Sequence, residues 1–135
     1  MKNYIAVSLL TVILFCTNCK KSDVIENNSE YDLPVESCAS GKATSSVSYK
    51  ICFNKLISDS RCPQGVMCVT AGFAEAEFSL TEGATTTVFK LATVKNSVLR
   101  SDTTINGIAI SLIDILPHPV FSKPQKNIKA VIKIN

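Results

Sequence analysis

The sequence has few of the residues from which enzyme active sites are usually built. His118 is the only histidine, and no Gly-x-Ser-x-Gly, His-Glu-x-x-His or phosphate-binding glycine loop is present. The Cys-x-x-Cys spacing typical of zinc sites is missing from the four cysteines beyond the N-terminal region, which are Cys38, Cys52, Cys62 and Cys68. We therefore expect a protein that is not an enzyme and that carries no metal or cofactor.

The chain also lacks a strong charge of either sign and a second long apolar run. Its formal net charge is +3, whereas nucleic-acid binding requires a much stronger basic bias. Beyond the N-terminal region no apolar stretch is long enough to cross a membrane as a helix. We expect no nucleic-acid partner.

The N-terminus does contain one apolar run, and it indicates export. Met1–Tyr4 carries a positive charge, Ile5–Phe15 is almost wholly apolar, and a polar tail begins at Lys20. This order is typical of a secretory signal peptide. A cysteine at the end of such a segment resembles the lipobox of bacterial lipoproteins. We expect residues 1–18 to be a lipoprotein signal peptide and Cys19 to carry the lipid.

Two cysteines compete for this anchor. Cys16 follows Phe15 inside the apolar run, whereas Cys19 follows Asn18 and directly precedes the charged tail. We favour Cys19, and an ordinary cleaved signal peptide remains the alternative. The expected location is the bacterial cell envelope, with lipid anchorage to the outer membrane and the leaflet left open.

The remaining chain divides into a tether and one small domain. Residues 19–36 are polar, with little periodicity, and predict a flexible tether. Residues 37–135 suffice for one domain, and their even number of cysteines predicts disulfides. Of the three possible pairings we favour Cys62–Cys68 and Cys38–Cys52. Each short closed loop then stabilises the fold by roughly 2–3 kcal/mol on the chain-entropy model.

Period-two alternation and β-branched composition dominate this domain, and no window keeps helical spacing over three turns. Asn106-Gly107 is a strong hairpin signal, and residues 98–100 are a candidate short strand. The pattern predicts an all-β sandwich or flattened barrel of six to eight mostly antiparallel strands. Its strongest strand candidates are Val47–Ile57, Gly72–Leu80, Thr85–Val94, Ile108–Leu116 and Ile128–Ile134.

The segment Asp59-Ser60-Arg61-Cys62-Pro63, with Cys68 six residues after Cys62, is the most distinctive motif. Asp59 can accept backbone N–H bonds in an Asx turn, and Arg61 can bind a carboxylate or carbonyls. With Ala71-Gly72 and Pro117-His118-Pro119, this motif resembles a pattern recurring in small uncharacterised bacterial lipoproteins. The resemblance implies an architecture and an envelope location, but no activity.

Candidate partner contacts lie on two loops. Gln64 to Met67 predicts a stiff projecting loop closed by the Cys62–Cys68 bridge, and His118 lies between two prolines. Stiff loops lose little entropy on binding. The alternative is that this loop is only a structural corner. Asp102-Thr103-Thr104 also resembles a short O-glycosylation signal, which makes Thr103 a candidate modification site.

Three functions are consistent with these features. We favour a non-enzymatic envelope lipoprotein whose β domain binds or scaffolds an unknown ligand. The alternative is an inhibitor of a protease or lysozyme-type hydrolase that acts through the Cys62–Cys68 loop. A third hypothesis, a small hydrolase or metal-binding accessory protein, depends on His118.

The anchor assignment predicts different outcomes for the two N-terminal cysteines. Cys19→Ser should leave the precursor uncut or without lipid, because it removes the acceptor thiol. Cys16→Ser should still be processed. Mass spectrometry of the mature N-terminus distinguishes the two, and a mature chain that begins at Cys16 would contradict the assignment.

Overall fold

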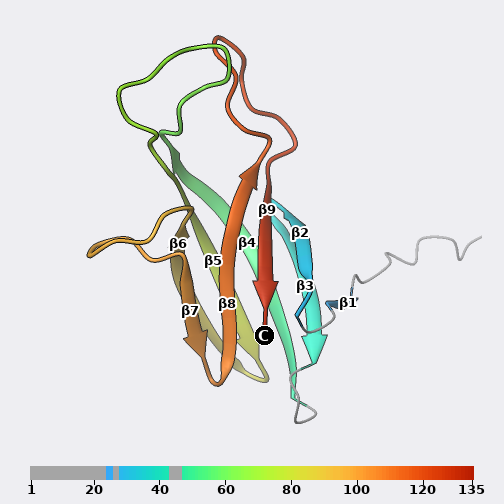
Figure 1. The fold of residues 1–135 in the computed structure, drawn as a ribbon. Helices are drawn as coiled ribbons and strands as arrows, with labels where there is room; N and C mark the ends of the chain where they lie inside the picture. Colours follow the sequence, from blue (N-terminus) through green and yellow to red (C-terminus); the bar gives the residue numbers. More distant parts are fainter. Residues whose placement is uncertain (1–23, 26–27, 43–46) are drawn as a thin grey trace, which may run out of the picture.

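The computed structural model describes residues 24–25, 28–42 and 47–135, and this part of the chain forms two facing β-sheets (Figure 1). It is a disulfide-bonded β-sandwich, which confirms the predicted fold class. The described residues contain nine strands, more than the six to eight expected. None of the described segments is a helix capable of crossing a membrane.

The first sheet has the strand order β1-β3-β4-β5-β6 and the second has the order β2-β9-β8-β7. All neighbouring strands are antiparallel except β1 and β3. The bounds are β1 Val24–Ile25, β2 Glu30–Pro34, β3 Ser37–Lys42, β4 Ser48–Asp59, β5 Ala74–Glu82, β6 Thr85–Ala92, β7 Asp102–Ile105, β8 Ile108–Leu116 and β9 Lys129–Ile134.

The five strand predictions correspond to β4, β5, β6, β8 and β9, with ends displaced by a few residues. The hairpin turn at Asn106 and Gly107 is confirmed, because both residues have positive φ between β7 and β8. The prediction of a strand at residues 98–100 is wrong. The strand lies instead at Asp102–Ile105, because Thr103 and Thr104 pair with β8 across that turn.

The flexible tether predicted to reach Glu36 is also partly wrong. Glu30–Pro34 forms β2, which pairs with β9 along its whole length. The physical reason is a short alternation in which Tyr31 packs against the core and Leu33 is buried, while Glu30 and Asp32 face solvent. The predicted signal peptide, Cys16 and Cys19 lie outside the described residues.

Apolar side chains from the facing strands fill the space between the sheets. Phe53, Phe78 and Phe89 form a row with ring centroids 5.2 Å and 5.8 Å apart. β8 lies inside the second sheet, between β9 and β7, where its largely apolar composition suits burial. The other large side chains with almost no exposed surface are Leu33, Tyr49, Ile51, Leu80, Leu91, Ile110, Ile115, Ile132 and Ile134.

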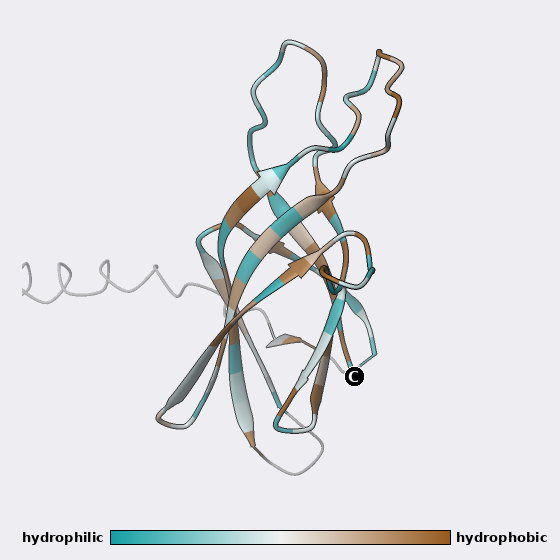
Figure 2. Cartoon of the chain, turned by 90° about the vertical axis from the view of Figure 1, so that its left-hand side faces the viewer, coloured by the Kyte–Doolittle hydropathy of each residue, from teal (hydrophilic) through white to brown (hydrophobic). Residues whose placement is uncertain are grey.

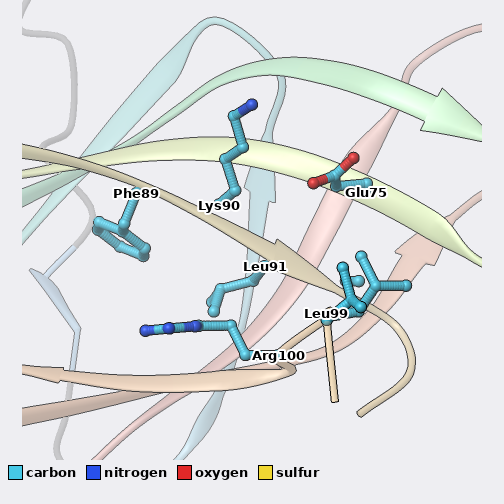
Figure 3. A pocket seen from close by; sticks show the side chains of 8 residues that line it. Glu75, Phe89, Lys90, Leu91, Leu99 and Arg100 are labelled. Atoms are coloured by element: carbon cyan, nitrogen blue, oxygen red, sulfur yellow. The ribbon is translucent and has the colours of Figure 1, made fainter. Parts of the chain in front are cut away.

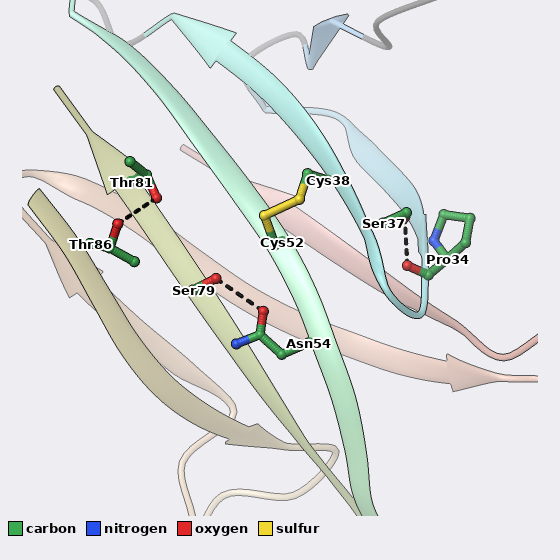
Figure 4. Close-up of a disulfide and its surroundings, with 8 residues drawn as sticks. All are labelled: Pro34, Ser37, Cys38, Cys52, Asn54, Ser79, Thr81 and Thr86. Atoms are coloured by element: carbon green, nitrogen blue, oxygen red, sulfur yellow. Dashed lines mark hydrogen bonds between the residues drawn. A yellow bond between two sulfur atoms is a disulfide. The ribbon is translucent and has the colours of Figure 1, made fainter. Parts of the chain in front are cut away.

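Both predicted disulfides are present. Cys38 and Cys52 are direct partners of β3 and β4 in the strand register, and their sulfurs are 2.12 Å apart. Figure 4 shows this bridge near the Ser79–Asn54 and Thr81–Thr86 hydrogen bonds. Cys62 and Cys68 are 2.17 Å apart at sulfur and close the loop after β4.

Figure 1 shows the two longest loops at one end of the sandwich, and β1, the first described strand, beside β3 away from that end. β1 pairs with Ser40 and Gly41, close to the end of β3. Two loops, residues 60–73 and 117–128, project from the other end, where β4 and β8 finish. The strands therefore separate these loops from the N-terminal entry point.

Leu33→Ala tests whether β2 belongs to the domain. Leu33 is only 1% exposed, so the cavity should lower the free energy of unfolding by about 2–5 kcal/mol. Chemical denaturation measures this change, and Glu30→Ala, at an exposed position of β2, is the matched control. If Leu33→Ala lowers the free energy of unfolding no more than the control does, β2 belongs to the tether and not to the domain.

Candidate partner-binding loops

Two loops form the end of the sandwich opposite the chain entry. The pinned loop (residues 60–73) joins β4 to β5, and the proline loop (residues 117–128) joins β8 to β9. The Gln64 N–H donates to the Pro119 carbonyl at 2.9 Å, and the Phe121 N–H donates to the Gln64 carbonyl at 3.4 Å. The two loops that carry the predicted contacts therefore touch each other, which the sequence did not predict.

The pinned loop has a narrow, hydrogen-bonded neck. The Ser60 N–H donates to the Phe73 carbonyl at 2.8 Å, and the Cys62 N–H donates to the Ala71 carbonyl at 2.9 Å. Gly72 has a φ of 66°, and a Cβ there would lie 1.8 Å from the Ser60 carbonyl oxygen. Only glycine fits this crossing of the two chain segments. The neck and the Cys62–Cys68 bridge together restrain the loop.

Arg61 lies at the base of the pinned loop and is paired with Asp59. Its backbone N–H donates to Asp59 Oδ1 at 3.1 Å, which completes the predicted Asx turn. Its Nε donates to Asp59 Oδ1 at 2.9 Å, and its Nη2 donates to Asp59 Oδ2 at 2.7 Å. Both side chains are only 6% exposed. This is the two-pronged carboxylate pairing that guanidinium geometry favours.

The same guanidinium crosses to the second sheet. Arg61 Nη1 donates to Asp114 Oδ1 at 2.8 Å and to the Ile115 carbonyl at 2.7 Å. The register of β8 with β9 shifts between Leu112 and Asp114, so Ile113 is left out of the pairing. Such bulges re-aim neighbouring side chains. Arg61 thereby connects the end of β4 with β8.

Gln125 of the proline loop completes this group. Its Nε2 donates to Asp59 Oδ2 at 2.9 Å and to the Pro117 carbonyl at 2.9 Å. Asp59, Arg61, Asp114 and Gln125 are hereafter called the Arg61 cluster. The predicted roles of Asp59 and Arg61 are confirmed, whereas the sequence carried no signal for Asp114 or Gln125, which are distant in the chain.

The cluster changes the acidity of its buried carboxyl. Burial alone raises the pKa of Asp59, but the hydrogen bonds from Arg61 and Gln125 outweigh it and hold the pKa below its usual range. A carboxyl with a lowered folded-state pKa stabilises the fold above its unfolded-state pKa of about 3.9. That contribution disappears as the pH falls through the folded-state value.

Five apolar side chains project from the two loops into solvent. Met67 and Val69 are fully exposed, Phe121 is 62% exposed, and Val66 and Val120 are each 37% exposed. These residues are called the tip patch. Figure 2 shows hydrophobic stretches on both projecting loops. The structure thus places the candidate Met67 in a larger exposed group that the sequence did not reveal.

The other two candidates, Gln64 and His118, line a shallow hollow of about 530 Å³ together with Lys126. The hollow lies between the loops, and Met67 is not part of it. His118 is half-buried, and its Nδ1 is screened from solvent without a hydrogen-bond partner among the described residues. Gln64 and His118 can therefore contact one ligand together, whereas Met67 does not line this hollow.

Outside the loops, Glu75 and Glu77 lie on β5 and the candidate Thr103 lies on β7. Glu77 pairs with Lys55 on the sheet surface, with Nζ and Oε2 3.7 Å apart. Glu75 lines a second shallow hollow of about 320 Å³ with Lys90 and Arg100, shown in Figure 3. Thr103, the candidate modification site, is half-buried in β7.

Among the described residues, no group of three or more His, Cys, Asp or Glu side chains is arranged to hold a metal ion. Comparison of the chain with protein-family models, with curated proteins and with solved structures finds no match. The function is therefore inferred from the geometry of the loops.

The Arg61 cluster predicts the acid sensitivity of the fold. Asp59→Asn should lower the free energy of unfolding at neutral pH by about 3–5 kcal/mol, because it leaves the buried Arg61 charge with Asp114 as its one remaining carboxylate among the described residues. It should also reduce the loss of stability that the wild type shows below about pH 4. Denaturation between pH 2 and pH 7 measures both effects.

Asp102→Asn is the control for this titration, because Asp102 is an exposed carboxylate paired with Lys95. Exposed pairs contribute little to stability, so this variant should unfold like the wild type at neutral pH. If Asp59→Asn loses stability with falling pH in the same way as the wild type, the Arg61 cluster is not the source of the acid sensitivity.

Proposed function

We propose that the protein is a lipid-anchored envelope lipoprotein whose β domain binds a partner protein through its two projecting loops. It acts without catalysis, a metal or a cofactor. Cys19 supplies the anchor, the sandwich supplies a rigid support, and Gln64, Met67 and His118 belong to the contact surface. The expected membrane is the outer membrane of a bacterial envelope.

One observation carries this proposal: fully exposed apolar side chains stand on a covalently restrained loop. Exposing the Met67 and Val69 side chains to water does not stabilise the fold. Contiguous exposed apolar groups commonly mark interaction sites. The Cys62–Cys68 bridge and the hydrogen bonds to the proline loop reduce the ordering entropy lost on binding. A loop that only connected β4 to β5 would need neither exposed apolar side chains nor a covalent restraint.

Inhibition of a protease or lysozyme-type hydrolase is the second candidate and would use the same loop. The observation that favours it is the shape of the pinned loop, which is closed at its neck and exposed at Val66 to Val69. A stiff convex loop can enter a concave active site. Loss of hydrolase activity on adding the purified domain would distinguish inhibition from scaffolding.

The double variant Gln64→Ala/Met67→Ala tests the contact surface. Truncation of central contacts usually costs at least 1 kcal/mol of binding free energy, or about fivefold in affinity. Both residues are exposed, so the thermal midpoint should not change. Quantitative co-purification of the full-length chain with its envelope partners measures binding, and thermal unfolding measures stability.

Thr86→Ala/Val88→Ala is the matched control, since it also truncates one polar and one apolar exposed side chain, on β6. It should leave binding unchanged. Cys68→Ala should weaken both binding and stability, because it opens the pinned loop. If the two double variants recover equal amounts of partner, the proposal that the loops form the contact surface is wrong.

A further inference from the structure

We propose that the tip patch docks into an apolar cleft of the partner protein that is lined with carboxylates. This inference rests on the proposed function, because it specifies the chemistry of the partner at the same loops. It follows from the charges of the loops, the shape of the tip patch and the place where the chain enters the domain.

Neither loop contains an acidic residue. The chain has 11 Asp and Glu residues, yet none occurs in residues 60–73 or 117–128. Two carboxylates at the base of the loops, Asp59 and Asp114, are both directed at Arg61. These two carboxylates are therefore held at the base of the loops by a buried cation.

Two lysines give the tip a positive charge. Lys123 and Lys126 of the proline loop are exposed, and neither forms an ion pair with a described residue. Lys126 lines the hollow with Gln64 and His118, and Lys123 lines an adjoining hollow with Val120. Cations beside an apolar patch match a partner surface on which carboxylates surround an apolar site.

The shape of the tip favours a concave partner. Met67 and Val69 project from a closed loop, so a flat surface would cover only part of their apolar area. Methionine has a flexible, polarizable side chain that adapts to irregular pockets. Phe121 adds an aromatic anchor on the neighbouring loop, and aromatic anchors in pockets carry much of the binding energy of protein interfaces.

The position of the chain entry favours a protein over the anchoring membrane. β4 has 12 residues, so about 40 Å of strand separates its start from the pinned loop. β1 pairs near the start of β4, on the side of the sandwich away from the loops. A lipid on Cys19 would be joined to the domain through β1, at the end of β4 away from the tip.

The first experimental step identifies what the tip touches in the cell. A photo-cross-linking amino acid is placed at position 67 of the full-length chain, and at position 88 as the control for an exposed site on β6. The inference predicts a protein adduct that forms at position 67 and not at position 88.

The second step tests the chemistry of that protein. The cross-linked protein is purified and titrated with the wild-type domain and with Lys123→Glu/Lys126→Glu. Affinity should fall at least tenfold for the variant, because its carboxylates face carboxylates. Added salt should weaken the wild-type complex, because it screens attraction, and should strengthen the complex of the variant, because it screens repulsion. Lys50→Glu/Lys90→Glu, which changes the net charge equally at exposed positions of the first sheet, should stay within twofold of the wild type.

Each result decides between the two proposals. If Met67→Ala weakens binding but the reversal of Lys123 and Lys126 does not, the loop surface stands and the acidic cleft is wrong. Adducts to lipid alone would assign the tip to a membrane and overturn the inference. If position 67 yields no more adduct than position 88, both the inference and the proposed function fail. Thermal unfolding of each variant confirms that the fold is intact.

Discussion

The buried guanidinium of Arg61 connects the two sheets at the end of the sandwich where the functional loops begin. It pairs with Asp59 at the end of β4 and with Asp114 on β8, and it also donates to the Ile115 carbonyl. Burying a charge costs several kcal/mol unless its partners compensate fully. Here the Nε, Nη1 and Nη2 atoms each find an acceptor, so the guanidinium can be buried against Asp59.

The cluster also positions both loops. Arg61 precedes the bridged Cys62, so fixing the arginine fixes the start of the pinned loop. Gln125 binds Asp59 from the proline loop, and the Gln64 N–H donates to Pro119 above it. A rigid support of this kind lets exposed apolar side chains stay ordered in solvent. Such preorganisation is what a recognition surface requires.

The sequence predicted the sandwich well because burial of one sheet face imposes a period of two. The alternation of Ala74, Ala76, Phe78 and Leu80 marks β5 directly. It did not predict β2, where Tyr31 and Leu33 are surrounded by acids and a proline in a strand of five residues. The local chemistry of Asp59, Arg61 and the two bridges was also predictable, because these contacts lie within a few residues or within a small set of pairings.

The contacts between the loops were not predictable, since they depend on tertiary structure. Asp114 and Gln125 are 53 and 66 residues from Arg61 and Asp59, respectively. Their roles depend on a bulge in β8 and on the path of the proline loop. The exposed group of Met67, Val69 and Phe121 likewise exists only because β4 and β8 end at the same edge of the sandwich.

Amide hydrogen exchange at the loops measures the central claim, that the Arg61 cluster holds the two loops as one ordered surface. In the wild type, the Cys62 and Gln64 amides should exchange slowly, since each donates to a backbone carbonyl. In Gln125→Ala, the Gln64 amide should lose protection while the amides of β4 and β9 keep theirs. A Gln64 amide that exchanges freely in the wild type, or that Gln125→Ala leaves unchanged, would contradict the account.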